Sequence, residues 1–496
     1  MAIYEELAQE IGRQIERGVL RPGERLPSVR MLGGSRGVSQ GTVMQAYYLL
    51  EDRGLISTRP RSGYYVNAKA RTPLPPPTLP DDTPQPVEVS IGQLIWNILD
   101  GIRHNDAVPL GSAFASPQLY PVAKLGQTLG NSARRLRPET LMADLPPGNA
   151  DLRRHIARRY LEIGIEVDAD GIVITNGASE ALLVSLYSTT RPGDIVAIES
   201  PAHYIPLHAI ENAGRRALCI PTCCEEGMNL EALARALETQ PVRAVWAMPT
   251  FQNPTGALMP ARRKRALVEL LARHDVPLIE NDVYGELYFG DERPPPAKLW
   301  DRGGRVLHCG TFSKILSPGY RVGWVAPGRY DVAARRHKFL LSVGTNVPAQ
   351  LALADFVRHG GFELHLRRLR ATLRIQRDQM LRAITRHFPA GTRVSRPEGG
   401  YFLWVQLPPG APDAVTLMHE ALRQGITLAP GALFSPREQF SAHLRLNYGQ
   451  PWSAEVERAV ATLGHLAAGG TDAEPEPRDA AAVLPLPSDL ECPGAR

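Results

Sequence analysis

The first 66 residues carry a hydrophobic pattern that predicts three short helices followed by two strands. Apolar residues recur at helical spacing over residues 3–16, and this pattern ends near Gly18. Ser28 and Ser39 each stand before a further helical stretch, in the position of an N-cap. Residues 54–66 then form two short β-type runs around a basic turn. The pattern therefore predicts a helix-turn-helix unit with a β-wing.

Two later stretches predict buried strands that end in polar groups. Residues 172–176 predict a strand that passes through a glycine turn into an apolar-periodic helix. Because backbone N–H groups are free at the start of a helix, residues 177–179 are expected to form an anion site. Residues 277–284 predict a second buried strand, which ends in the carboxylate of Asp282 and the phenol of Tyr284.

Proline separates these regions. Residues 69–89 are dense in proline, and such chain is extended, semi-rigid and poorly suited to join a core. This segment is expected to be a linker that sets the reach between two domains. Residues 468–496 combine scattered prolines, charges and an alanine run, which predicts a disordered tail.

The composition fits a soluble multidomain protein. With 496 residues, 43% of them hydrophobic, the chain can form roughly three domains. The net charge of +5 is compatible with nucleic-acid binding without establishing it. No stretch is long and apolar enough to span a bilayer, and no signal peptide precedes Ile3. The five cysteines form neither a zinc spacing nor a disulfide framework, which predicts a cytoplasmic protein without a metal site.

One lysine stands among groups suited to hold a phosphorylated aldehyde. Thr311 and Ser313 lie three positions and one position before Lys314, and Arg321 lies seven after it. Hydroxyl and guanidinium groups bind phosphate oxygens. A lysine whose pKa is lowered attacks carbonyl groups, and pyridoxal phosphate (PLP) is the usual carbonyl partner. A solvated surface lysine is the alternative, and the surrounding polar groups favour the PLP interpretation.

The segment around Lys314 resembles the lysine motif of fold-type I aminotransferases, and the other family landmarks follow in the family's order. By this resemblance Lys314 forms the Schiff base with PLP, and Asp282 pairs with the pyridine nitrogen. Arg445 would hold a substrate α-carboxylate in a bidentate fork. The other residues implied to hold the cofactor are Gly177, Ala178, Ser179, Thr311, Ser313 and Arg321 around the phosphate, Asn253 and Tyr284 at the phenolic oxygen, and His203 or Tyr204 against the ring.

Two positions depart from the aminotransferase pattern. His203 stands where the family usually stacks an aromatic ring on the cofactor, and a histidine there is expected to titrate near neutral pH. Ala143 stands where a tyrosine commonly reaches the phosphate across the dimer. That cross-subunit hydrogen bond is therefore expected to be absent.

Residues 3–66 resemble the GntR-type winged helix. The motifs Leu-Pro-Ser-x-Arg, Gly-Val-Ser, Gly-Leu-Ile and Gly-Tyr stand at the family's positions. The resemblance implies binding to double-stranded DNA through the recognition helix and the wing. The implied DNA contacts are Arg30, Ser39, Gln40 and Thr42 in the helices, with Arg59 and Arg61 in the wing.

The winged helix also departs from its family. Gln40 replaces a common arginine, and because glutamine can pair with adenine, the change alters the preferred site without abolishing binding. Gly33 and Gly34 each cost about 1 kcal/mol inside a helix, so the helix after Ser28 is expected to be short or frayed. A small dimerisation or docking module is the alternative, but the joint helix-turn-helix and wing pattern favours DNA binding.

Together the two resemblances indicate the MocR subgroup of GntR regulators. The implied domains are a winged helix over residues 1–68, the linker over 69–89, an α/β PLP-dependent transferase domain of fold type I over 90–467, and the tail over 468–496. The transferase domain is expected to hold a mostly parallel seven-stranded sheet in a large subdomain, about residues 120–345, and a smaller α/β subdomain, about 346–467. The family also implies a homodimer, commonly head-to-tail, on paired DNA half-sites.

The expected function is transcriptional regulation in which an amino acid or amine effector is sensed by transaldimination at Lys314. A working aminotransferase with an appended DNA-binding or docking module is the main alternative, because every residue needed for a half-reaction is present. A DNA-binding protein that has lost PLP is a third interpretation. The sequence identifies neither the effector, nor the operator, nor the direction of regulation.

Overall fold

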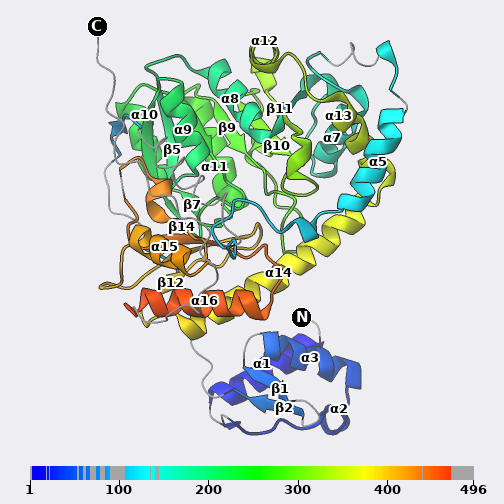
Figure 1. The fold of residues 1–496 in the computed structure, drawn as a ribbon, viewed down its shortest axis with the longest axis vertical. Helices are drawn as coiled ribbons and strands as arrows, with labels where there is room; N and C mark the ends of the chain where they lie inside the picture. Colours follow the sequence, from blue (N-terminus) through cyan, green and yellow to red (C-terminus); the bar gives the residue numbers. More distant parts are fainter. Residues whose placement is uncertain are drawn as a thin grey trace.

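The computed structural model describes residues 3–17, 19–21, 23–52, 55–59, 63–67, 74–78, 84–89, 107–134, 136–139, 145–437 and 439–470. Some predicted features lie outside this description, namely Arg61, Ala143, the side chain of Arg59 and residues 471–496. The predictions made for them stay predictions. Figure 1 shows a small N-terminal unit and a much larger α/β body.

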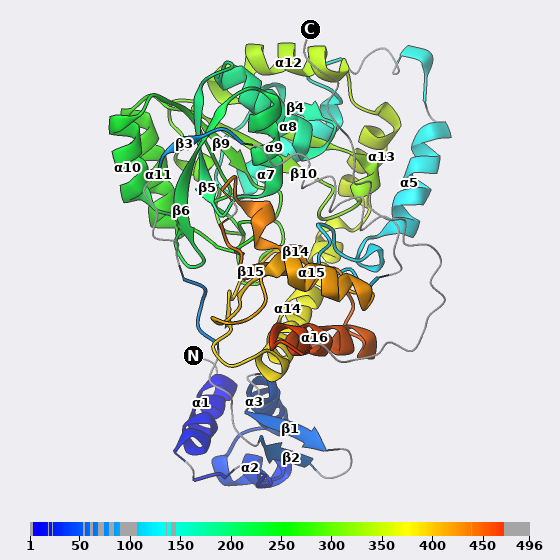
Figure 2. The same cartoon turned by 60° about the vertical axis from the view of Figure 1, so that its left-hand side comes forward.

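The N-terminal unit has the predicted order of three helices and a two-stranded wing, and lies apart from the α/β body in both ribbon views (Figures 1 and 2). The predicted caps form, because Ser28 Oγ accepts from Met31 N and Ser39 Oγ accepts from Thr42 N. The predicted apolar face of the third helix is fully buried, at Val43, Ala46, Tyr47 and Leu50. The elements are α1 (Ile3–Glu16), α2 (Val29–Arg36), α3 (Gln40–Asp52), β1 (Ile56–Arg59) and β2 (Gly63–Val66).

Helix α2 is short, as expected, but Gly33 and Gly34 lie inside it and do not fray its end. The helix continues to Arg36 and stops at Gly37, whose φ of 66° is the left-handed conformation that favours glycine. A Cβ on Gly33 would lie 3.0 Å from Val38 O. The missing side chain therefore allows the turn into α3 to close tightly against α2.

The large subdomain is built on one twisted sheet. Its strand order is β3-β6-β5-β8-β9-β10-β11-β4, with the short β7 paired to β6. Seven strands form the predicted mostly parallel sheet, in which only β11 runs against its neighbours. Two short strands, β3 and β7, extend it to nine. The strands are β3 (Pro86–Val87), β4 (Val173–Thr175), β5 (Ile195–Ser200), β6 (Arg216–Cys223), β7 (Gly227–Met228), β8 (Val242–Ala247), β9 (Leu278–Asn281), β10 (Val306–Thr311) and β11 (Gly323–Ala326).

Helices cover both faces of this sheet, because successive strand residues point to opposite sides. In β5, Val196 and Ile198 pack under α8 and α9, while Ile195 and Ala197 pack with α10 and α11 on the other face. The helices are α5 (Val122–Arg134), α7 (Ala150–Glu162), α8 (Gly177–Thr189), α9 (Tyr204–Asn212), α10 (Leu230–Thr239), α11 (Ala261–Arg273), α12 (Asp331–Ser342) and α13 (Val347–His359). Short 3₁₀ turns occur at Pro117–Leu119, Ala169–Gly171, Ala297–Trp300, Pro318–Tyr320, Gly328–Tyr330 and Gly431–Phe434.

The small subdomain is a four-stranded antiparallel sheet, β12-β13-β15-β14, flanked by three helices. Residues 107–116 join it, since Asn447 N donates to Leu110 O and Val108 bridges Ile426. Helix α13 packs instead on α5 and α7, so the division expected at residue 346 falls before a helix of the large subdomain. The elements are α14 (Phe362–His387), β12 (Arg393–Val394), β13 (Phe402–Gln406), α15 (Ala414–Arg423), β14 (Ala429–Pro430), β15 (His443–Asn447) and α16 (Ala454–Ala467).

The proline-rich segment is not detached from the α/β body, which corrects the expectation that it would not join a core. Leu74 packs against an apolar cluster that spans both subdomains, and Val89 is buried in a cluster of the large one. Residues 86–87 form β3 at the edge of the large sheet. The described parts of this segment, residues 74–78 and 84–89, are therefore docked on both subdomains.

Within the residues that the structure describes, no helix combines the length and apolarity needed to cross a membrane. The same described residues contain no group of three or more His, Cys, Asp or Glu side chains arranged to hold a metal ion.

Candidate functional site

Lys314 follows the end of β10 and reaches into the space between the two subdomains. Its Nζ donates to Ala113 O at 2.9 Å and lies 4.2 Å from the centre of the Phe114 ring. Burial of the amine, and then the charges of Arg445 and Arg321, lower the pKa of Lys314 to about 7. About half of the amine is therefore neutral near pH 7, and the neutral form is the one that can attack a carbonyl carbon.

The lowered pKa of Lys314 predicts how loading of an aldehyde depends on pH. In protein freed of cofactor, the rate constant for reaction with pyridoxal will rise about tenfold per pH unit below pH 7 and level off above it. Stopped-flow absorption measures this rate, and pyridoxal is the preferred probe because it lacks the titrating phosphate. A rate that keeps rising toward about pH 10, the ordinary range of a lysine, would contradict the lowered pKa.

The start of α8 and the side chain of Arg321 form a candidate anion site. This helix has no side-chain cap at Asn176, so its first N–H groups are free to bind a ligand. A Cβ on Gly177 would lie 2.6 Å from Arg321 Nη2, so glycine is required for the guanidinium to approach the helix start. Thr311 Oγ1 lies 3.1 Å from Ser313 Oγ and 3.0 Å from Val322 O. Gly177 therefore lies against Arg321, and Thr311 against Ser313, while their role as phosphate contacts stays a prediction.

Asp282 follows β9 and is almost fully buried. Its Oδ2 accepts from Arg293 Nη2 at 2.8 Å and lies 3.1 Å from His308 Nε2. Burial alone would raise the pKa of Asp282, but the hydrogen bond from His308 and the charge of Arg293 outweigh it and lower the pKa. The carboxylate is therefore ionised and able to pair with a protonated ring nitrogen.

Three residues that position Asp282 were not predicted from the sequence. Trp324 Nε1 donates to Tyr160 Oη at 3.0 Å, and Tyr160 Oη lies 2.6 Å from His308 Nδ1. We assign the tyrosine hydrogen to His308 Nδ1, so that Nε2–H of His308 donates to Asp282. The one available signal was a histidine inside the apolar run of β10.

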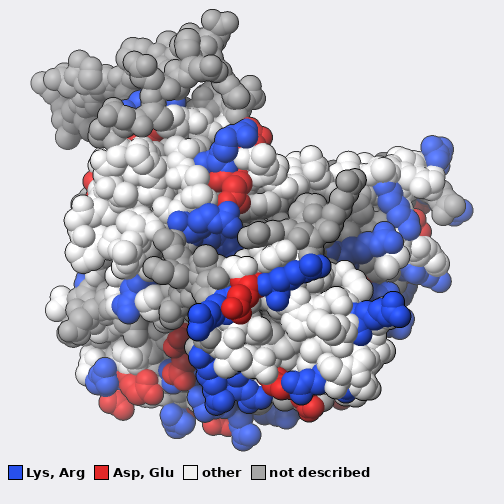
Figure 3. All heavy atoms as spheres, turned by 90° about the horizontal axis from the view of Figure 1, so that it is seen from below, with Lys and Arg blue, Asp and Glu red and all other residues white. Residues whose placement is uncertain are grey.

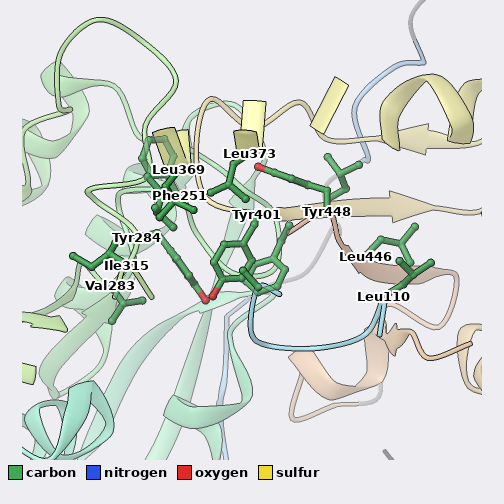
Figure 4. Close-up of a cluster of buried hydrophobic side chains, with 14 of the residues drawn as sticks. Leu110, Phe251, Val283, Tyr284, Ile315, Leu369, Leu373, Tyr401, Leu446 and Tyr448 are labelled. Carbon is green, nitrogen blue, oxygen red and sulfur yellow. The ribbon is translucent and has the colours of Figure 1, made fainter. Parts of the chain in front are cut away.

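Tyr284 and Asn253, the predicted contacts of the phenolic oxygen, are both buried. Tyr284 is 2% exposed and meets the Tyr401 ring edge-on, with 5.3 Å between ring centres, in the apolar cluster of Figure 4. Burial raises the pKa of Tyr284, so its hydroxyl stays protonated and can donate a hydrogen bond. Asn253 is 1% exposed, and its Oδ1 accepts from Arg445 Nη1 at 3.2 Å.

His203 does not titrate near neutral pH, which corrects the expectation from the sequence. Burial first, and then the charges of Arg445 and Lys314, lower the pKa of His203 well below its ordinary value. Its Nδ1 accepts from Ile205 N and so caps α9, while its ring lies 4.1 Å from the Tyr204 ring. His203 is therefore a neutral ring held in one orientation.

Arg445 lies in β15 and is 1% exposed, although a lone arginine in a strand is more often a surface residue. Its guanidinium lies over the Phe402 ring, 4.2 Å from the ring centre, and Nη2 donates to Gly111 O at 2.6 Å. Among the residues described, no carboxylate forms an ion pair with it. A buried guanidinium without a counter-ion is suited to receive an anionic ligand.

The site fits PLP because three predicted contact residues retain buried polar atoms without a protein partner. These atoms are Asn253 Nδ2, Asp282 Oδ1 and Arg445 Nε. Buried polar groups are normally hydrogen-bonded, so three such atoms around one lysine indicate a ligand site. They belong to the residues that the resemblance assigns to the phenolic oxygen, the ring nitrogen and a bound carboxylate in turn.

The predicted DNA contacts are only partly free to read bases. Arg30 and Gln40 are exposed. The hydroxyls of Ser39 and Thr42 lie 2.8 Å apart and Ser39 Oγ caps α3, so both hydroxyls are engaged within the protein. Viewed from below the orientation of Figure 1, basic and acidic side chains are interspersed, so charge alone does not mark a DNA-binding face (Figure 3).

Comparisons with known proteins agree with both halves of the chain. Residues 137–463 match the family Aminotransferase class I and II, and residues 3–66 match Bacterial regulatory proteins, gntR family. The Escherichia coli protein described as uncharacterized HTH-type transcriptional regulator YdcR is 42% identical over 94% of this chain and 99% of its own length. Aromatic-amino-acid aminotransferase 1 of Thermococcus litoralis is 30% identical over 74% of this chain and 90% of its own.

Among solved structures, LysN, an α-aminoadipate aminotransferase of Thermus thermophilus complexed with N-(5'-phosphopyridoxyl)-L-leucine, aligns with a TM-score of 0.68. It is 29% identical, and the alignment covers 76% of this chain and 94% of LysN. The shared fold and the fit of the site support PLP as the cofactor. The chain belongs to the aminotransferase class I and II family and, with its gntR-family DNA-binding domain, has the MocR-type architecture of HTH transcriptional regulators.

Proposed function

We propose that this protein is a PLP-dependent transcriptional regulator that senses an amino acid or amine at Lys314. The cofactor supplies an aldehyde carbon on which the amine of the effector can replace that of Lys314. Its phosphate would be held by Gly177, Ala178, Ser179, Thr311, Ser313 and Arg321. Its ring would be held by Asn253, Asp282, Tyr284, His203 and Tyr204.

The observation that carries this proposal is the partly unsatisfied, buried guanidinium of Arg445 beside a lysine of lowered pKa. Arg445 can bind an α-carboxylate while Lys314 exchanges with the neighbouring α-amine. An amine effector without a carboxylate would leave Arg445 unused. The proposal therefore favours an α-amino acid over a simple amine.

The docked linker offers a route from this site to DNA. Val394 N donates to Pro75 O, and Gln406 Nε2 donates to Thr78 Oγ1 at 2.9 Å, both from the small subdomain. A few residues later β3 pairs with β6 of the large subdomain. A shift of the small subdomain toward the effector would therefore pull on the chain that leads to the winged helix.

A Gln406→Leu variant tests this route. It removes the hydrogen bonds to Thr78 and should reduce the coupling between effector and operator binding by roughly 1 kcal/mol, without changing operator affinity in the absence of effector. Fluorescence anisotropy with labelled operator DNA measures both affinities. Gln240→Leu, at the end of α10, is the matched control. Coupling equal to that of the unaltered protein would exclude this contact from the route.

DNA binding is assigned to the winged helix, with Arg30, Gln40 and the wing arginines Arg59 and Arg61 as the proposed contacts. Ser39 and Thr42 are retained as contacts through the start of α3. A homodimer, arranged head-to-tail, would present two such domains to paired half-sites. A regulator that binds genomic operators in this way would act in the cytoplasm, which is the proposed location.

An Arg30→Ala variant should weaken operator binding about tenfold while leaving the absorption spectrum of bound PLP intact. Anisotropy titration at two salt concentrations measures the loss, because a phosphate contact also lowers the salt dependence. An altered PLP spectrum would mean that the two parts of the chain are not separable in this way.

Catalytic transamination is the second candidate, since the T. litoralis relative is named as an aminotransferase. A gel-shift experiment separates regulation from catalysis. It uses the DNA upstream of the gene that encodes this chain, with and without PLP and a panel of amino acids. Operator binding that responds to one amino acid supports regulation. Multiple-turnover keto-acid production without specific promoter binding would overturn it.

A further inference from the structure

The group behind Asp282 is an arginine held by its own network of buried charges. Arg293, in the loop after β9, donates from Nη2 to Asp282 Oδ2, and its Nη1 lies 3.3 Å from Glu286 Oε1. Glu286 also pairs with Arg159 at 2.9 Å and with Arg370 at 3.1 Å. Arg293 is thus fixed from both ends in one orientation.

The two carboxylate oxygens of Asp282 are therefore not equivalent. Oδ2 receives both Arg293 and His308, whereas Oδ1 is buried and has no protein partner. A Cβ on Gly285 would lie 2.5 Å from either oxygen, so the chain leaves room for this orientation of the carboxylate. Only Oδ1 is available to a ligand.

We propose that Arg293 is a positioning residue for the cofactor ring, which turns Oδ1 of Asp282 toward the ring nitrogen and lowers that nitrogen's affinity for a proton. This inference rests on the proposed binding of PLP at Lys314. The carboxylate of Asp282 favours a protonated ring nitrogen, and the guanidinium on its far side opposes it. The strength of the ring as an electron sink is then set by the pair, not by Asp282 alone.

Among the described residues, Arg293 is the one group of permanent charge that forms a direct ion pair with Asp282. The other charged and titratable groups nearby act differently. His308, from β10, meets the same carboxylate oxygen as Arg293, at 3.1 Å. Tyr160, from α7, contacts His308 and not the carboxylate. Lys264 of α11 and Glu280 of β9 act on Asp282 only through space, and they oppose each other. Removal of Arg293 is therefore the substitution that changes the field at Oδ1 most.

The test is the protonation of the ring nitrogen itself. With PLP labelled with ¹⁵N in the ring, the nitrogen chemical shift is followed against pH in the unaltered protein and in Arg293→Gln. The substitution should raise the pKa of the ring nitrogen by about one pH unit or more, because a nearby cation is lost. Arg293→Lys, which keeps the charge, should restore a pKa close to that of the unaltered protein.

Two further variants separate this effect from damage to the fold. Arg370→Gln contacts the same Glu286 but not Asp282, and should leave the ring nitrogen unchanged. If Arg293→Gln does not fold, the double variant Arg293→Gln, Glu286→Gln removes one positive and one negative charge together and takes its place. A cavity is lined by Tyr160, Glu286, Arg293 and His308. Water in this cavity can therefore reach a carboxylate that loses its arginine partner in either variant.

An equal pKa of the ring nitrogen in the unaltered protein and in the Arg293 variant would overturn the inference. So would a nitrogen that stays protonated over the whole pH range of both proteins. Failure of PLP binding at Lys314, on which the inference rests, looks different, because PLP would then give no visible absorption band with the unaltered protein.

Discussion

In a Lys314→Ala variant, the visible absorption band of protein-bound PLP will be lost and basal operator binding will persist. The band requires a covalent bond between the cofactor and an amine, and Lys314 is the amine whose pKa is lowered to about 7 in the site. The winged helix contributes its own buried core and does not depend on this bond. Absorption spectra and anisotropy titrations measure the two outcomes.

The response to effector is the decisive readout for Lys314→Ala. If sensing is covalent, the effector-induced change in operator affinity, typically about 1–3 kcal/mol of coupling, will disappear. Lys264→Ala would not serve as a control, because Lys264 is fully buried and donates a hydrogen bond to Thr250, so its loss would disturb the fold. Lys124→Ala, on α5, is the better control, and it should keep both the band and the response. An unchanged response in Lys314→Ala would refute covalent sensing.

An Arg445→Gln variant will lose affinity for an amino-acid effector by about a hundredfold. A guanidinium–carboxylate pair inside a dry site makes two charge-assisted hydrogen bonds, and the amide of glutamine cannot replace its charge. Because no described carboxylate pairs with Arg445, the substitution strands no protein anion. It does remove the hydrogen bonds to Gly111 O and Asn253 Oδ1, so denaturant unfolding of the effector-free protein is measured alongside binding.

Three comparisons sharpen the Arg445 result. Arg445→Lys keeps the charge but not the fork and should bind with intermediate affinity. Arg377→Gln, which changes a partly exposed arginine of the small subdomain, should leave effector binding normal. The affinity for an amine effector without a carboxylate should not change in the Arg445 variants. Equal losses of affinity for amines and for amino acids would therefore contradict the proposed role of Arg445. Isothermal titration calorimetry or the shift of the visible band measures these affinities.

Local patterns were sufficient to predict the elements that carry the site. The periodicity and caps of residues 3–66 fixed the three helices, and the strand, glycine turn and helix around Gly177 formed as expected. These features depend on hydrogen bonds and side-chain faces within a few residues, which the sequence shows directly. The expectations for His203 and for the linker were wrong, because burial and docking depend on distant partners.

The partners of Asp282 could not have been predicted in the same way. His308, Tyr160 and Arg293 come from a strand, a helix and a loop that are separated by up to 148 residues. None carries a motif of its own. Their roles arise only when the parallel order of β9 and β10 sets neighbouring strand ends side by side.

The sequence by itself determined which chemistry is possible, namely a lysine with phosphate-binding neighbours behind a winged helix. The tertiary structure decided the state of each group. It buried Arg445 without a counter-ion, lowered the pKa of Lys314 to about 7, kept His203 neutral and left one oxygen of Asp282 unpaired. The reason is that residue types and local spacing are written along the chain, whereas solvation and charge pairing depend on which distant residues fold around a group.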